Sequence, residues 1–253
     1  MGLANRYSNS TISFGHVTPA VKWLLIANVG LFILHFFLAR AGLGGLIAPL
    51  GLSPHEVLTG FAFWQPVTYL FIHSATSFSH ILFNMLALYM FGSPLEQTWG
   101  SNRFLRFYFA SGIGAAVFVI VLNLFFGSID TRTIGASGAI YGLLLAFGLM
   151  FPEAVVLFAF IFPMKAKYFV AIIGAIVFLS SIGDTGSGVS HFAHLGGMVA
   201  GFLYMRTGMM YKRGPGLASS LEQVYKDYKL RRAKKKFQVY LKKQDQGRDR
   251  WTN

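Results

Sequence analysis

The sequence contains no cysteine and unusually few charged residues. The absence of cysteine among its 253 residues excludes a disulfide framework, a thiolate metal site and a cysteine nucleophile. Asp, Glu, Lys and Arg make up 12% of the chain, about half of the roughly 25% found in an average soluble protein. A soluble domain with so few charges could not cover its surface. The composition therefore predicts an integral membrane protein.

Long apolar runs are what the sequence has instead, since 54% of its residues are hydrophobic and 26 are phenylalanine. A helix needs about 20 apolar residues to cross a bilayer, and the runs predict an all-α polytopic membrane protein with six spans. The segment Val155–Phe162 lies between Pro152 and Pro163 and is too short to span. It is expected to form a loop or a half-buried extension of the fourth span. The six predicted spans are Ala20–Ala39, Ser79–Gly92, Phe104–Phe126, Gly135–Phe151, Tyr168–Ile182 and Val189–Arg206.

The positive charge is concentrated at the C-terminus. Residues 208–253 hold 13 of the 22 Lys and Arg residues and 4 of the 9 acids, which gives this segment +9 of the total of +13. Lys and Arg favour the cytoplasmic side of membrane proteins, and with six spans only Arg40 and Arg132 fall outside. We therefore expect a cytoplasmic segment over 1–19, a membrane domain over 20–207 and a basic cytoplasmic tail over 208–253. The tail is expected to lie on anionic lipid headgroups, and nothing beyond charge indicates a nucleic-acid partner.

The first outside loop, roughly Ala41–Phe78, is long and apolar. It contains Trp64 and Tyr69 together with several phenylalanines. Trp and Tyr are enriched at membrane–water interfaces, so this loop is expected to lie partly within the membrane.

Ionisable and strongly polar side chains inside spans are costly and mark functional sites. No Asp or Glu lies in the core of a predicted span, which excludes a carboxylate proton relay or a carboxylate ion path. The polar residues in the spans are His35, His80, Asn84, Asn123, Ser137, His191 and His194.

Ser137 lies in the run Gly135-Ala136-Ser137-Gly138, where the fourth span begins. Free N–H groups and the positive dipole end of a helix N-terminus would stabilise an anion that develops there. Glycines on either side allow close backbone approach. The alternative is ordinary packing of small residues between membrane helices.

His194 lies near the outer end of the last span and therefore at a depth similar to that of Ser137. A serine and a histidine form the minimal activated nucleophile. Tyr141, four residues after Ser137, shares its helix face and could orient the imidazole ring. Gly197 and Gly201 form a small-residue stripe that allows a neighbouring helix to approach closely.

Other interpretations of these polar residues remain open. His194 could be a packing histidine, or could hold a metal with His191, although zinc sites usually use a third ligand; we expect no metal and no cofactor. His80 and Asn84 lie on one face of the second span and could donate hydrogen bonds to an oxyanion. The alternative for this pair is hydrogen bonding between helices.

Together these motifs resemble the rhomboid family of intramembrane serine proteases. The resemblance is carried by Gly135-Ala136-Ser137-Gly138, by Ala193-His194-Leu195-Gly196-Gly197 with Gly201, and by His80-x3-Asn84. It covers roughly residues 20–206 and extends to Gly92-Ser93-Pro94-Leu95-Glu96-Gln97-Thr98-Trp99-Gly100, which is similar to the family's loop after the second span. One departure is Gln65, where an arginine often follows the loop tryptophan.

The resemblance implies a membrane-embedded first loop and a Ser–His dyad that cleaves transmembrane protein substrates. It implies that Ser137 is the nucleophile and His194 the base. It also implies that His80 and Asn84 contribute to the oxyanion hole and that Tyr141 packs on the catalytic histidine. A bacterial inner membrane, with both termini cytoplasmic, is the expected location.

Two alternatives belong to other functional classes. A catalytically silent relative could bind transmembrane segments, but such a protein should lack the serine or the histidine. A small transporter would be expected to show internal repeats, paired broken helices or buried charges, and the sequence shows none of these.

Overall fold

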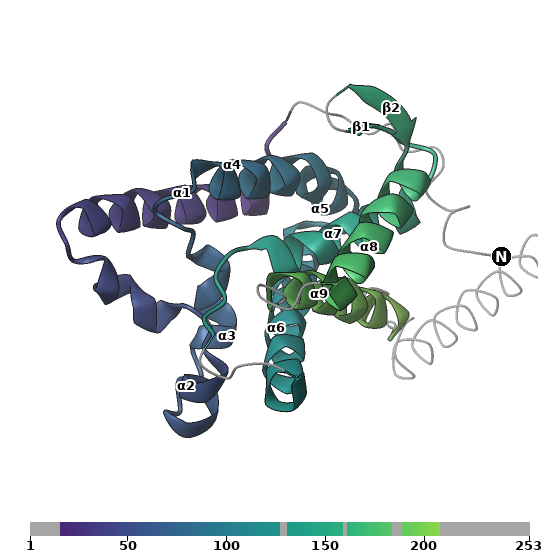
Figure 1. Cartoon of the computed structure of the whole chain (residues 1–253). Helices are drawn as coiled ribbons and strands as arrows, with labels where there is room; N and C mark the ends of the chain where they lie inside the picture. The colour runs from purple at the N-terminus through teal and green to yellow at the C-terminus, as the bar shows by residue number, and fades with distance from the viewer. Residues whose placement is uncertain (1–15, 127–130, 159–160, 184–188, 208–253) are drawn as a thin grey trace, which may run out of the picture. The chain divides into compact units, whose positions relative to one another are not determined.

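The computed structural model describes residues 16–126, 131–158, 161–183 and 189–207. The chain divides into two compact units, Met1–Met210 and Tyr211–Asn253. The predicted basic tail and most of the predicted N-terminal segment lie outside the described residues. The fold described below is that of the first unit (Figure 1).

Within the described residues, six helical segments coincide with the six predicted spans. Three of them, Pro19–Arg40, Phe78–Trp99 and Ser101–Phe125, are long and apolar enough to cross a membrane, and Ser137–Met150 and Ala166–Ser181 are shorter apolar helices. The six segments are α1 (Pro19–Arg40), the run α4, η4 and α5 (Phe78–Ala87, Leu88–Gly92 and Ser93–Trp99), α6 (Ser101–Phe126), α7 (Ser137–Met150), α8 (Ala166–Gly183) and α9 (Val189–Arg206).

The second segment extends further than the sequence predicted. Its expected end was Gly92, followed by a loop, but the helix continues through α5 to Trp99. Pro94 has no N–H to donate, and its ring crowds the carbonyl four residues earlier. A wide π turn over Leu88–Gly92 comes directly before this proline, and such turns relieve a proline inside a helix.

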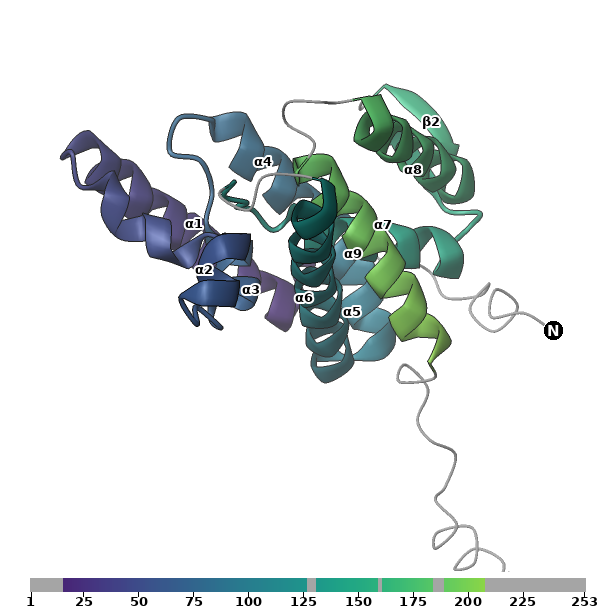
Figure 2. The ribbon, with the colours of Figure 1, turned by 60° about the horizontal axis from the view of Figure 1, so that its bottom comes forward.

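The helices α6, α7 and α9 pack together at the centre of the unit (Figure 2). Helix α7 is apolar all round, and most of its residues are buried, as expected for a helix surrounded by others. In contrast, α1 buries only the stripe Ala20, Val21, Leu24 and Asn28. The central position of α7 fixes the location of Ser137, its first residue.

A buried carboxylate ties the start of α1 to α5. Glu96 accepts hydrogen bonds from the backbone N–H groups of Ala20 and Val21 and from the hydroxyls of Thr18 and Ser101. The first N–H groups of a helix have no partner within the helix, and a negative charge at that end is favourable. Glu96 therefore caps α1 from a distant part of the chain.

The first outside loop is folded into short helices. They are η2 (Gly44–Leu50), α2 (Pro54–Thr59), α3 (Gln65–Thr68) and η3 (Tyr69–Phe71). Tyr69 and Leu70 are buried against the helices, whereas Phe61, Phe63 and Trp64 are exposed. Exposed aromatic side chains of this kind fit the predicted contact with lipid.

The prediction for Val155–Phe162 was wrong, because a β-hairpin follows α7. Strand β1 (Val155–Phe158) pairs antiparallel with β2 (Phe162–Lys165). Pro152 ends the helical run, and the β-branched and aromatic residues of β1 favour an extended chain. Pro163 lacks an N–H and is therefore tolerated only in an edge strand. Both strands of a two-stranded sheet are edge strands, so the hairpin can accommodate it.

Candidate active site

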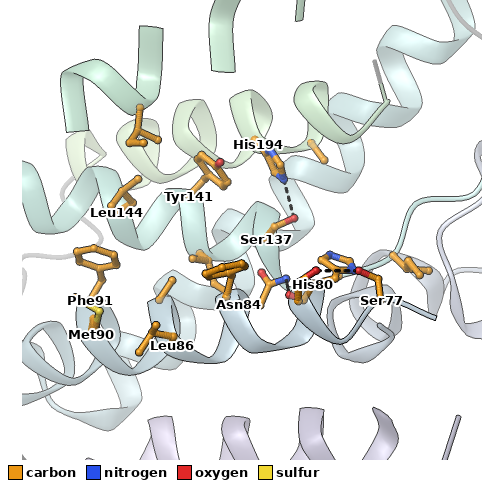
Figure 3. Close-up of a pocket in the computed structure, with 18 of the residues that line it drawn as sticks. Ser77, His80, Asn84, Leu86, Met90, Phe91, Ser137, Tyr141, Leu144 and His194 are labelled. Carbon is orange, nitrogen blue, oxygen red and sulfur yellow. Dashed lines mark hydrogen bonds between the residues drawn. The ribbon is translucent and has the colours of Figure 1, made fainter. Parts of the chain in front are cut away.

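Ser137 and His194 come together from α7 and α9. Nε2 of His194 lies 2.9 Å from Oγ of Ser137, and Figure 3 shows the two side chains pointing toward each other across the gap between their helices. Both side chains are only partly buried, so the hydroxyl remains accessible. The arrangement allows the imidazole nitrogen to accept the hydroxyl proton.

Ser137 is the first residue of α7, which is preceded by a strained backbone turn. Gly135 has a φ of +117°, a conformation that other residues rarely adopt. Its N–H is held by the carbonyl of Tyr69 from the first loop, at 2.9 Å. The 14 residues of α7 extend about 21 Å at 1.5 Å per residue, which is less than the roughly 30 Å apolar core.

Tyr141 stacks on the imidazole ring of His194. The ring centroids are 4.1 Å apart, and the ring planes differ by 15°. His191 lies one turn away from His194 on α9, with ring centroids 6.2 Å apart. Within the described part of the chain, no group of three or more metal-ligating side chains gathers. The stacked tyrosine therefore limits the orientations that the imidazole can adopt.

His80 and Asn84 of α4 line the same pocket (Figure 3). A methyl group on Gly135 would lie 2.9 Å from Nε2 of His80 and 3.8 Å from Oγ of Ser137, so these two atoms approach the same point. The Asn84 amide donates one hydrogen bond to its own helix, at the carbonyl of His80, 2.7 Å away. An amide has two N–H donors, so a second one remains for a ligand.

A cavity of about 860 Å³ extends from these residues between α4, α7 and α8. Ser77, His80 and Ser137 line its polar part, while Met90, Phe91 and Ile173 line its apolar part. Val156, Leu157 and Phe158 of the hairpin contribute the wall at the far end of α7. A mostly apolar cavity with a few convergent polar groups is typical of a binding site.

Glycines allow α7 and α9 to approach closely enough for the contact between serine and histidine. A Cβ at Gly197 would lie 1.9 Å from the carbonyl oxygen of Gly138, and one at Gly201 would lie 3.1 Å from Cα of Gly142. Helices in contact at this distance leave no space for a side chain between them. Gly135, Gly138, Gly197 and Gly201, all selected from the sequence, therefore lie at the contacts that shape the site.

An ion pair near the site was not predicted from the sequence. Arg132, five residues before Ser137, pairs with Glu56 of α2 and donates to the carbonyls of Ala48 and Gly51. Gln65 donates to the same carboxylate, at the position where the family often has arginine. Glu56 is the one carboxylate or basic charge in the sequence between Ala41 and Phe78, and Arg132 is the one basic residue between Gly127 and Ile134; that signal could have suggested the pair.

His73 ends the run Tyr69-Leu70-Phe71-Ile72-His73, which resembles the family's first loop, but the sequence assigned it no role at the site. Its side chain is fully buried, and its ring centroid lies 5.2 Å from that of His80. The carbonyl of His73 faces Nδ1 of His35 at 2.8 Å. His73 therefore packs against His80, which lines the pocket.

Comparison with known families matches residues 60–211, more than half of the chain, to the rhomboid domain. The chain belongs to the rhomboid family. It is thus an integral membrane protein of a family of intramembrane proteases. The matched range includes Ser137, His194, His80, Asn84 and Tyr141.

Several rhomboids of known sequence are similar to this chain. Rhomboid protein 1, mitochondrial, of Saccharomyces cerevisiae is 34% identical over 139 residues, covering 52% of this chain and 38% of the yeast protein. Rhomboid protease GluP of Bacillus subtilis is 28% identical over 198 residues, covering 75% of this chain and 35% of GluP. Rhomboid protease AarA of Providencia stuartii is 31% identical over 159 residues, covering 58% of this chain and 56% of AarA. The match thus spans about a third to a half of these relatives' length.

Proposed function

We propose that this rhomboid is a serine endopeptidase that cleaves membrane proteins in or near their transmembrane segments, with Ser137 as nucleophile and His194 as general base. The observation that carries the proposal is the 2.9 Å contact between Nε2 of His194 and Oγ of Ser137. A nucleophile within hydrogen-bonding distance of its base, with the base held by a third group, is the arrangement that activates a serine.

In the proposed reaction, the proton of the Ser137 hydroxyl passes to Nε2 of His194 as Oγ bonds to the substrate carbonyl carbon. The imidazolium then returns this proton to the leaving amine as the peptide bond breaks, and an acyl-enzyme remains. Water attacks the acyl group, giving its proton to His194, and the Ser137 oxygen leaves with that proton. His194 acts as base and acid in turn.

Three groups are proposed to stabilise the oxyanion: the backbone N–H of Ser137 at the start of α7, the imidazole of His80 and the free amide N–H of Asn84. Donors that are already in place cost no reorganisation when charge develops. A triad's acid mainly fixes the tautomer and orientation of its histidine. The stacked ring of Tyr141 is proposed to fix the orientation of His194 here.

The substrate is proposed to unwind before it is cut. A helix in lipid satisfies its backbone groups internally, so Ser137 cannot reach a carbonyl within an intact helix. Unwinding is easiest where Gly or Pro weakens the helix. Since Ser137 begins a short helix and lies near the outer surface in the proposed topology, cleavage is expected near the outer end of the substrate segment. Small residues are expected just before the cut bond.

The test uses the purified full chain in detergent with a panel of single-span substrates. Ser137→Ala and His194→Ala should each abolish cleavage without a change in melting temperature. His191→Ala, one turn away on α9, is the matched control and should retain most activity. Equal loss of activity at His191 and His194 would contradict the assignment of the base.

The alternative function is that of a catalytically silent rhomboid that binds transmembrane segments. It predicts that wild type and Ser137→Ala bind the panel equally and that neither cleaves it.

Replacing the Gly and Pro residues of a cleaved substrate by Leu should suppress cleavage even when the residues at the cut are unchanged. Undiminished cleavage of an all-Leu segment would contradict the proposed unwinding step.

A further inference from the structure

The hairpin after α7 packs on the protein in part and also carries exposed apolar side chains. Val156 is 5% exposed and packs in the core, whereas its neighbour Val155 is 62% exposed. Successive side chains of a strand point to opposite faces, which explains this alternation. Four apolar side chains of the hairpin are exposed, namely Val155, Leu157, Ile161 and Phe162. Val155 and Leu157 lie on one face, and Leu157 also lines the cavity of the site. Phe162 pairs with Phe158 on the other face, and it is exposed together with Ile161 at the end of the hairpin far from α7.

A cluster of charges marks where the hairpin leaves the membrane helices. Glu153 pairs with Lys165 at 2.7 Å and with Lys167 at 2.5 Å. Hydrogen bonds from these two lysines lower the pKa of the Glu153 carboxyl to about 2, so this carboxyl stays charged at neutral pH. Charged groups and lysines are favoured at the level of the lipid headgroups. The base of the hairpin therefore lies at the membrane surface opposite Ser137, where α7 ends and α8 begins.

From this base, the hairpin folds back along α8. The ring of Phe158, at the far end of β1, lies 6.1 Å from the ring of Phe169 in the first turn of α8. Phe169 in turn stacks on Phe91 at 5.9 Å. Figure 2 shows β2 alongside α8. The far end of β1 thus lies at the level of Phe169, two residues further along α8 than Lys167 of the charged cluster.

We propose that the hairpin is embedded in the leaflet opposite Ser137, with its exposed apolar side chains in contact with phospholipid acyl chains. In water, these four side chains would form an apolar patch of the kind that marks an interaction site. The continuity of the hairpin with α7 and α8 makes lipid the partner. Lys165 and Lys167 lie at the level of the phosphates, to which basic side chains are attracted.

The strand edges limit how deeply the hairpin inserts. Unpaired backbone N–H and C=O groups on a sheet edge are not tolerated in the hydrocarbon centre. Both strands have four residues and one unpaired edge each. The hairpin therefore lies just below the headgroups, where water and lipid oxygen atoms reach its edges.

The chain has no cysteine, so single cysteines can be spin-labelled without background. Ile161→Cys and Phe162→Cys would carry nitroxides in vesicles of phosphatidylethanolamine and phosphatidylglycerol, and collisions with oxygen and with a water-soluble nickel chelate would be measured. Asn102→Cys, at the exposed start of α6, is the aqueous control. Val117→Cys, exposed in the middle of α6, is the lipid control.

Labels at 161 and 162 should collide with the nickel chelate several-fold less often than the label at 102, and should favour oxygen as the label at 117 does. Nickel collisions equal to those at 102 would overturn the proposal. Ile161→Trp offers a second measurement that needs no label. Lipids brominated near the headgroup end of the acyl chain should quench its added fluorescence more strongly than lipids brominated near the chain terminus. Equal fluorescence in brominated and unbrominated lipid would also overturn the proposal.

Discussion

Replacing Gly197 by Ala should separate α7 from α9 and disable the site while leaving the chain folded. The added Cβ would lie 1.9 Å from the Gly138 carbonyl oxygen, about 1.5 Å closer than ordinary van der Waals contact. Both partners are backbone, so neither can rotate away. Overpacking typically costs about 1–3 kcal/mol, which corresponds to a fall in melting temperature of roughly 2–12 °C for a chain of this size.

The effect on activity should exceed the effect on stability. A shift of about 1 Å at an active site can cost about 10²-fold in rate, and the Ser137–His194 contact spans the same two helices. The assay is kcat on a single-span substrate beside thermal unfolding in the same detergent. Gly30→Ala on α1 is the control, because its Cβ would meet nothing within 4 Å. Wild-type kcat and melting temperature in Gly197→Ala would refute the reasoning.

Three further predictions concern the surroundings of the dyad. Removing one oxyanion donor typically costs about 10²–10³ in kcat. Steady-state kinetics of Asn84→Ala and His80→Ala should therefore both show a lower kcat, with the larger loss in His80→Ala. An unchanged kcat in both variants would make these two residues packing residues. Tyr141→Phe should keep most activity because the stacked ring remains, whereas Tyr141→Leu should lower kcat with little change in KM; similar kinetics in the two variants would exclude a role for stacking. The hydrogen bonds from Arg132 lower the pKa of Glu56. The stabilisation that the ionised carboxylate gives to the fold should therefore be complete above the unfolded-state pKa of about 4.3. It should be lost as the pH falls through the lower pKa of the folded state. The free energy of unfolding of Glu56→Gln, measured against pH, should lack this pH-dependent stabilisation. A pH profile identical to that of the wild type would contradict the prediction.

Residue patterns were sufficient to predict the membrane class and the six helical segments. Spans of about 20 apolar residues have few structural solutions in a bilayer, and this explains why α1, α6 and α9 lie close to their predicted limits. Local backbone structure that depends on contacts with other segments was harder to predict. The sequence showed Pro94 but not the π turn that carries the helix past it. It also showed that Val155–Phe162 was too short to span, but not that a partner strand would pair with it.

In the candidate site, too, the sequence predicted the residues but not the contacts between them. Ser137, His194, His80, Asn84 and Tyr141 could be selected from the sequence because polar side chains are rare in apolar spans and their spacing places them on helix faces. The hydrogen bond between Ser137 and His194 joins residues 57 positions apart, and its length depends on how closely α7 and α9 pack.

The ion pair between Glu56 and Arg132 and the cap that Glu96 places on α1 join residues more than 70 positions apart. No local pattern encodes such contacts. By itself, the sequence determined the membrane class of the chain and which polar residues had to avoid lipid. Only the tertiary structure decided which of them meet, because partners distant in sequence are brought together by helix packing.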